Sequence, residues 1–168
     1  MSIVSDQRLL SHLDAAYNLA RWLMGNPEDA EDVVQDAYVR AMAGADGFRG
    51  GDERAWLLSI VRNGCYSSHR RQRARRTTDF DESAHAEDTV TPSPERRAIE
   101  RDASRRVRLA VQGLAPDFRE VIVLREFEGL SYKEIAEVVA APVGTVMSRL
   151  SRARAQLALV LAEDGGGS

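Results

Sequence analysis

The sequence predicts an all-α protein in which a flexible acidic linker joins two small helical domains. Apolar residues recur at helical spacing on both sides of residues 77–95, whereas that segment has almost no apolar periodicity and contains two prolines. The 168 residues, of which 43% are hydrophobic, can bury one moderate core or two cores of roughly 70 residues each. We therefore divide the chain into a first domain (1–76), the linker (77–95), a second domain (96–162) and a disordered tail (163–168).

The first domain begins with two predicted helices. Apolar positions from Leu9 to Met24 predict one amphipathic helix, which Gly25 and Asn26 end, and Pro27 opens the next helix. The second helix has an apolar stripe made of Val33, Val34, Ala37, Tyr38, Ala41 and Met42. Its other side is mainly acidic and comprises Glu28, Asp29, Glu31, Asp32, Gln35, Asp36 and Arg40. Such a face repels DNA, so it serves either a protein partner or solubility.

A glycine-rich loop at residues 44–52 precedes the third helix. The loop is expected to expose Phe48 beside Arg49, although Phe48 can equally be a core residue beneath an ordinary loop. The helix packs Trp56, Leu57, Ile60 and Val61 inward. Its remaining positions carry Asn63 and the strongest basic run of the chain, which comprises Arg62, Arg70, Arg71, Arg73, Arg75 and Arg76.

The second domain contains a predicted helix-turn-helix. A core helix precedes it, with Leu114, Val121, Ile122, Leu124 and Phe127 inside. Ser131 and Glu134 have the spacing of a capping box, and Ala140, Ala141 and Pro142 interrupt the helical pattern. The following helix has an apolar stripe of Val146, Leu150, Ala153 and Leu157.

The outward face of this last helix is small and cationic. It presents Ser148, Ser151, Arg152 and Ala155, with Arg149 and Arg154 on the flanks. Such a face fits a major groove roughly 12 Å wide and offers donors to base edges and phosphates. The alternative is an ordinary helix pair with solvated arginines, but the cap, the turn and the arginine cluster agree on DNA binding.

The net charge of -3 conceals a segmented distribution. Residues 1–47 carry three arginines and eight acids, whereas residues 48–76 carry eight arginines and two acids. Residues 79–95 carry six acids and no base. Because phosphate attraction depends on charges within a Debye length of roughly 8 Å, the distant acids do not abolish DNA binding.

Several protein classes find no support in the sequence. No apolar run approaches the roughly 20 residues of a membrane span, and the first residues lack a secretory signal, so we expect a cytoplasmic protein. The single cysteine, Cys65, excludes an internal disulfide; with His69 it forms either half of a metal or redox site or ordinary packing. Nothing resembles a phosphate-binding loop, a nucleophile with its base or a metal cluster, so we expect no cofactor, no metal and no catalytic centre.

Five stretches of the chain resemble one family. EGLSYKEIAEVV followed by PVGTVMSRLSRAR is similar to the carboxy-terminal promoter-reading domain of bacterial sigma factors, especially the extracytoplasmic-function (ECF) subgroup of the sigma-70 family. The preceding LAPDFREVIVLREF is similar to the helix before that motif. NPEDAEDVVQDAYVRAM and FRGGDERAWLLSIVRN resemble the other domain of the family. The resemblance covers nearly all residues from about 9 to 160.

The resemblance implies a transcription initiation factor that binds core RNA polymerase and promoter DNA, as duplex and as melted non-template strand, and that an anti-sigma factor holds inactive. Polymerase contacts, in sigma region 2, fall to Asp32, Gln35, Asp36 and Arg40. Minus-ten recognition and melting fall to Phe48, Arg49, Gly50, Gly51, Asn63, Arg70 and Arg71. Minus-thirty-five recognition, in sigma region 4, falls to Thr145, Met147, Ser148, Arg149, Ser151, Arg152 and Arg154. The family's linker threads polymerase channels, so the acids here either mimic a phosphate chain or belong to a plain tether.

The chain departs from the common family pattern at two places. Ser67 stands where an aspartate usually follows the asparagine, which leaves the arginine positions and the promoter subgroup open. Met147 and Ser151 stand where relatives often have basic and aromatic or larger residues, so the upstream promoter sequence that relatives read cannot be transferred to this chain. The alternatives are a freestanding helix-turn-helix regulator that binds a palindrome as a dimer, an arginine-rich RNA-binding protein and, least supported, an enzyme.

Overall fold

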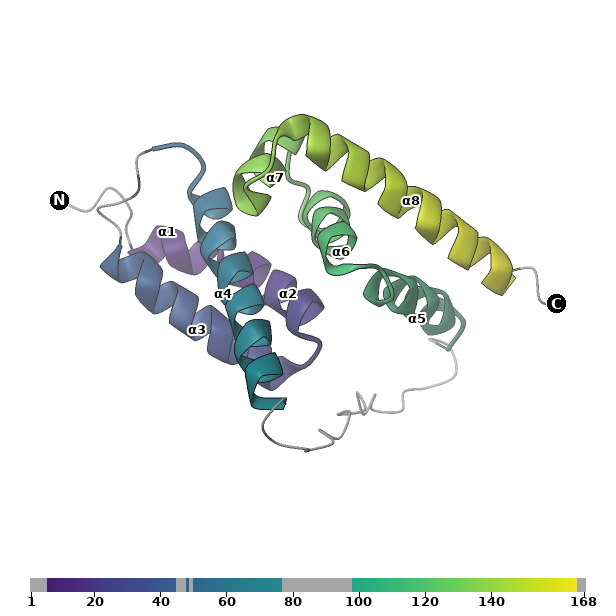
Figure 1. The fold of residues 1–168 in the computed structure, drawn as a ribbon, viewed down its shortest axis with the longest axis horizontal. Helices are drawn as coiled ribbons and strands as arrows, with labels where there is room; N and C mark the ends of the chain where they lie inside the picture. The colour runs from purple at the N-terminus through teal and green to yellow at the C-terminus, as the bar shows by residue number, and fades with distance from the viewer. Residues whose placement is uncertain (1–5, 45–47, 49, 77–97, 166–168) are drawn as a thin grey trace.

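The structure, a computed structural model, describes residues 6–44, 48, 50–76 and 98–165, so the predicted linker lies outside the described residues. The first domain comprises α1 (Asp6–Ser11), α2 (Leu13–Met24), α3 (Pro27–Ala43) and α4 (Glu53–Arg76). The second comprises α5 (Ala98–Gln112), α6 (Pro116–Ile122), the π-helical turn η3 (Val123–Phe127), α7 (Tyr132–Val139) and α8 (Val143–Gly165). Within these ranges there is no strand, and the all-α prediction is confirmed (Figure 1).

Local signals set the boundary between α2 and α3. Gly25 ends α2 with φ 86°, a backbone conformation that a Cβ atom disfavours. The Asn26 side chain accepts a hydrogen bond from the Asp29 amide at 2.8 Å and so caps α3. The predicted single helix from Leu9 is wrong, because the chain turns at His12, whose amide bonds to the Leu9 carbonyl three residues back.

The second domain differs from the prediction at two points. Phe127 was expected in the core but is 47% exposed. The π-helical turn explains this, since its wider winding, closed by a bond from the Glu128 amide to the Val123 carbonyl, rotates Phe127 away from the core. The predicted tail begins too early, because α8 continues to Gly165.

The two domains pack directly on each other. Helix α4 lies against α7, and α2 lies against α6 and η3 (Figure 1). Buried apolar residues of both domains, among them Leu58 and Val61 of α4 and Ile135 of α7, belong to one connected cluster. The contact between the domains is therefore continuous with the core of each.

Candidate nucleic-acid interface

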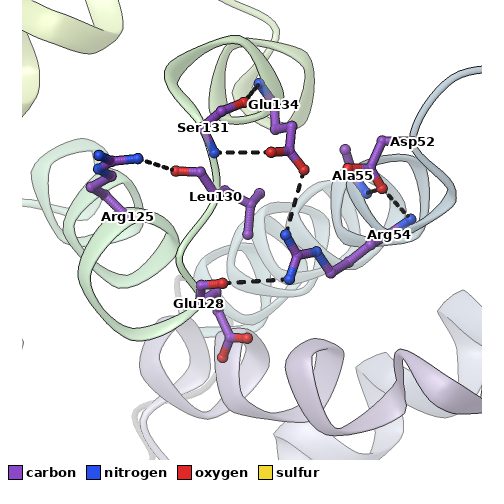
Figure 2. Close-up of polar contacts among 8 residues, drawn as sticks. All are labelled: Asp52, Arg54, Ala55, Arg125, Glu128, Leu130, Ser131 and Glu134. Carbon is purple, nitrogen blue, oxygen red and sulfur yellow. Dashed lines mark hydrogen bonds and ion pairs between the residues drawn. The ribbon is translucent and has the colours of Figure 1, made fainter.

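The cap and the turn of the helix-turn-helix are as predicted. The Ser131 amide donates to Glu134 Oε1 at 3.0 Å, and the Glu134 amide donates to Ser131 Oγ at 3.1 Å (Figure 2). Ala140 then ends α7 in the left-handed conformation, with φ 54°. The Val146 amide donates to the Pro142 carbonyl at 3.1 Å, which starts α8. These bonds fix the angle at which α8 leaves the motif.

The buried and exposed sides of α8 separate as the sequence predicts. Val146, Leu150 and Ala153 are at most 1% exposed. Met147, Ser148, Ser151, Arg152 and Arg154 are exposed, and Thr145 and Arg149 are half-buried. The predicted minus-thirty-five residues therefore lie together on or beside one accessible side of α8.

Acids from the same domain hold the two flanking arginines of α8. Arg154 NH2 lies 2.7 Å from Glu126 Oε1, and Arg149 Nε lies 4.0 Å from Asp117 Oδ2. The hydrogen bond to Glu126 raises the pKa of Arg154. Arg152 has no ion pair with any described residue, so it is the arginine of this face that is free to meet a ligand without losing an acid.

The predicted minus-ten residues of α4 are exposed. Asn63, Arg70 and Arg71 all lie on the accessible side of the helix. Arg70 NH2 donates to Ser67 Oγ at 3.2 Å, so the serine that replaces the usual aspartate still receives a bond from this arginine. The arginine is oriented, but without the charge that a carboxylate would supply.

The prediction that the loop exposes Phe48 is wrong. Phe48 is 6% exposed and packs against Trp56, with ring centroids 5.2 Å apart. Burying an aromatic ring against another one is more favourable than leaving it in water. Gly50 and Gly51 are exposed with φ of 89° and 99°, and Arg49 lies outside the described residues. The alternative prediction, that Phe48 is a core residue beneath the loop, is confirmed.

The acidic face of α3 is accessible, as predicted. Asp32, Gln35, Asp36 and Arg40 are exposed, and Arg40 Nε lies 3.2 Å from Asp36 Oδ2. Val39 lies among them and is 64% exposed, although the sequence-based prediction named only polar contacts on this face. Its signal in the sequence is the spacing of three and seven residues from Asp36 and Asp32, which places it on their side of the helix.

A buried ion pair joins the domains. Arg62 of α4 donates through Nε and NH2 to the Glu120 carboxylate of α6, at 2.8 and 3.2 Å. Glu120 is fully buried, and burial raises its pKa although Arg62 opposes the shift. Burial lowers the pKa of Arg62, but the hydrogen bond and charge of Glu120 outweigh that effect and raise it overall. The sequence signal for Glu120 was its position on the buried side of α6, one turn before Val123 and Leu124.

Arg54 makes a second polar contact between the domains. Its guanidinium donates to the Glu128 carbonyl and to Glu134 Oε2, each at 3.4 Å (Figure 2). Hydrogen bonds with Asp52, Ser131 and Arg54 lower the pKa of Glu134 to about 2. Glu134 therefore both caps the helix-turn-helix and binds the first domain.

Two contacts of α2 complete the junction. The rings of Trp22 and Phe127 stack with their centroids 5.3 Å apart and their planes 9° from parallel. Asn18 donates to Glu128 Oε1 at 2.6 Å. The aromatic stack accounts for the position of Phe127 outside the core of its own domain.

Cys65 is a packing residue of α4. Its thiol is buried, and this burial raises its pKa to about 12. His69 Nε2 lies 2.7 Å from the Leu23 carbonyl, so that nitrogen donates to the backbone. In the part of the chain that the structure describes, no group of three or more histidine, cysteine or acidic side chains could hold a metal, and no helix is long and apolar enough to cross a membrane.

The fold is that of a two-domain helical protein whose second domain contains a capped helix-turn-helix. The family model for sigma-70 region 2 matches residues 9–75, and that for sigma-70 region 4 matches residues 104–157. The RNA polymerase sigma-H factor of Pseudomonas aeruginosa is 39% identical over 137 residues, which cover 76% of this chain and 70% of that protein. The chain belongs to the sigma-70 family, in its ECF subgroup.

Other similar proteins support the assignment to the sigma-70 family. The ECF RNA polymerase sigma factor SigE of Mycolicibacterium smegmatis is 33% identical over 94% of this chain, which spans 62% of that protein's length. Among solved structures, the sigma factor RpoE in complex with the anti-sigma factor NepR from Bartonella quintana has a TM-score of 0.72 and 33% identity, covering 93% of this chain and 95% of that one. CnrH in complex with the cytosolic domain of CnrY has a TM-score of 0.66 and 31% identity, covering 94% and 87%.

Proposed function

We propose that this chain is a transcription initiation factor that binds core RNA polymerase and directs it to specific promoters. The observation that carries the proposal is the capped helix-turn-helix, whose second helix exposes serines and Arg152 opposite a buried stripe, in a chain with sigma regions 2 and 4. The first domain then ends at residue 76 and the linker at residue 95, and the second domain extends to the end of α8 at Gly165. Promoter-dependent transcripts from purified core polymerase only when this protein is added would support the proposal; their absence on every template of a promoter library would contradict it.

Polymerase docking falls to the exposed face of α3. Asp32, Gln35, Asp36 and Arg40 supply polar contacts, and Val39 supplies an apolar centre for them. Reversal of charges at an interface mainly slows association. Asp32→Arg with Asp36→Arg should therefore weaken core binding by about tenfold or more in a low-salt titration.

A matched control has the same change in net charge elsewhere. Asp14 and Glu137 are exposed on α2 and α7. Asp14→Arg with Glu137→Arg should leave core affinity within about twofold of the unchanged protein. Equal loss of affinity in both double variants would mean that net charge, rather than the face of α3, controls binding.

Minus-thirty-five recognition falls to the outer side of α8, with Thr145, Met147, Ser148 and Ser151 beside the arginines. Arg152 is the base-edge candidate, so Arg152→Ala should change sequence preference across a promoter library and cost about 1–3 kcal/mol at the preferred site. Arg149 and Arg154 are candidates for phosphate contacts, and each must first break its ion pair with an acidic side chain of this domain. Arg105→Ala on α5 is the control, and a library profile that Arg152→Ala does not change would contradict this orientation.

Minus-ten recognition and melting fall to Arg49, Gly50 and Gly51 of the loop and to Asn63, Arg70 and Arg71 of α4. The burial of Phe48 against Trp56 gives it the role of supporting the loop rather than that of stacking on a base. Asn63→Ala should reduce permanganate-detected strand separation while the closed complex persists. A pre-melted template should partly restore transcription, because its bases are already unpaired and the few kcal/mol needed to unpair a base are no longer required.

We further propose that an anti-sigma factor inhibits the protein, because one solved relative is the complex of a sigma factor with an anti-sigma factor. The proposed role requires no catalysis by this chain, since polymerase makes the RNA. It also places the protein in the bacterial cytoplasm, where polymerase acts.

A further inference from the structure

A cavity of about 560 Å³ lies where the end of α2, the second half of α4 and the start of α6 meet. Its volume falls in the range of roughly 300–1,000 Å³ that is typical of small-molecule sites, which often occur at domain interfaces. Both domains contribute to its wall. None of the residues that line it belongs to α3, so it is separate from the polymerase surface proposed above, although it shares Arg70 with the proposed minus-ten surface.

Positive charge dominates the wall of this cavity. Arg70, Arg73 and Arg119 line it together with His69, and no acid is among the described residues that line it. Arg70 donates to the neutral Ser67 hydroxyl, and for Arg73 no ion pair occurs with any residue in the described ranges. An anion entering the cavity would therefore meet cations that no carboxylate yet neutralises.

Arg119 is the least exposed of these arginines. Its NH1 donates to the Trp22 carbonyl at 3.3 Å, and its NH2 donates to the Gln112 and Leu114 carbonyls at 2.9 Å each. Its Nε is buried and has no hydrogen-bond partner. Carbonyl dipoles orient this guanidinium without cancelling its charge, and a buried donor without a partner points to a missing ligand or ion.

The rest of the wall is apolar. Leu23 and Met24 from α2 and Pro116 from α6 lie beside the arginines, and the buried Cys65 belongs to the same wall. An inorganic anion would satisfy the arginines but leave this apolar surface in contact with water. A group that is charged at one end and apolar at the other matches both parts.

We propose that the cavity is a binding site for a small organic anion, a carboxylate attached to an apolar or aromatic body. The carboxylate meets Arg73 and Arg119, and the apolar body covers Leu23, Met24 and Pro116. This proposal goes beyond the proposed function, which involves polymerase, DNA and protein partners only.

Occupation of the site has a conformational consequence. The ligand contacts Met24 and Arg73 in the first domain and Pro116 and Arg119 in the second. A ligand that needs both domains binds only the arrangement in which they are packed together, and it therefore shifts the population toward that arrangement. Such a ligand would oppose the separation of the two domains.

The test is isothermal titration of the full chain with three probes. Cinnamate has an aromatic body and a carboxylate, cinnamamide has the same shape without charge, and inorganic phosphate has charge without the body. We expect one-to-one binding of cinnamate that is about tenfold or more tighter than that of either other probe, as the loss of a charge-assisted bond implies. The methyl resonance of Met24 should shift on saturation.

Variants place the binding in this cavity. Arg73→Gln should weaken cinnamate binding about tenfold, and Arg108→Gln, on the exposed side of α5, should not change it. Glu120→Gln, which weakens the junction between the domains, should also weaken cinnamate binding. Arg73 is exposed and holds no fold contact among those described, so this variant tests the site without unfolding it.

Four results would overturn the proposal. They are cinnamate heats that do not saturate, cinnamamide binding as tightly as cinnamate, phosphate binding as tightly as cinnamate, and full affinity in Arg73→Gln. Full affinity in Glu120→Gln, in a sample whose scattering shows separated domains, would equally remove the claim that the site spans both domains.

Discussion

Glu120→Gln should make the two domains separate far more readily than an exposed substitution does. Glutamine keeps the size of the side chain but removes the charge, and its amide nitrogen cannot accept the second bond from Arg62. The carboxylate is fully buried and accepts both bonds at 2.8 and 3.2 Å. The variant therefore leaves the guanidinium of Arg62 at the junction without a counter-charge.

The magnitude follows from the burial of the pair. Removal of one partner of a buried ion pair costs about 3–5 kcal/mol. The Arg62 side chain keeps 20% of its surface exposed, so water screens part of its charge and the lower value, about 3 kcal/mol, applies. For a separation that leaves both domains folded, this energy corresponds to a shift of roughly 150-fold in the equilibrium between packed and separated domains.

Small-angle scattering and amide exchange measure that shift. Glu120→Gln should increase the radius of gyration and the exchange of amides in α4 and α7. The matched control is Glu126→Gln, which breaks the exposed pair with Arg154 and should change stability by about 1 kcal/mol or less. Arg62→Met with Glu120→Met should restore packing, since apolar pairs often replace buried ion pairs without loss. A Glu120→Gln protein with the scattering of Glu126→Gln would refute the assignment of this pair as the main polar contact.

Three further predictions concern single sites. Hydrogen bonding lowers the pKa of Glu134 to about 2. The ionised carboxylate therefore stabilises the fold fully above the ordinary pKa of 4.5, and this stabilisation is lost as the pH falls toward 2. The melting temperatures of Glu134→Gln and the unchanged protein should differ at neutral pH and converge over that range. Ala140→Gly should stabilise the protein by about 1–2 kcal/mol in urea titrations, because Ala140 has a positive φ that its Cβ disfavours, whereas the β-branched Ala140→Val should destabilise it. Burial raises the pKa of Cys65 to about 12, so iodoacetamide should label it at pH 8 only in denaturant; rapid labelling of the folded protein would contradict its packing role.

Those parts of the fold that short-range chemistry controls could be predicted from the sequence. The capping box of Ser131 and Glu134 uses atoms three residues apart, and Gly25 ends a helix through its own backbone freedom. The exposed and buried sides of α8 follow from periodicity alone. For this reason the candidate DNA face could be predicted residue by residue.

The remaining features depend on contacts between distant residues. Nothing near Phe48 in the sequence indicates that Trp56 provides a surface to bury it. Arg62 and Glu120 are 58 residues apart, and the periodicity of each helix shows which side a residue occupies but not which partner it meets. Phe127 faces Trp22 only because a π-helical turn rotates it, and sequence periodicity assumes an ordinary α-helix.

The proposed function requires the junction between the domains to open. Minus-thirty-five and minus-ten elements are about 25 base pairs apart, or roughly 85 Å of duplex. A compact chain of this length has a radius of gyration of about 15 Å and is roughly 40 Å across, so packed domains cannot reach both elements. Separation of a buried ion pair such as Arg62–Glu120 costs little free energy. The attraction between the two charges is lost, but water or polymerase then solvates charges that were desolvated in the packed arrangement. When the domains separate, the stacked rings of Trp22 and Phe127 become exposed to water, and no gain in solvation offsets that loss. The free energy of polymerase binding must therefore mainly offset the loss of the apolar contacts between the domains.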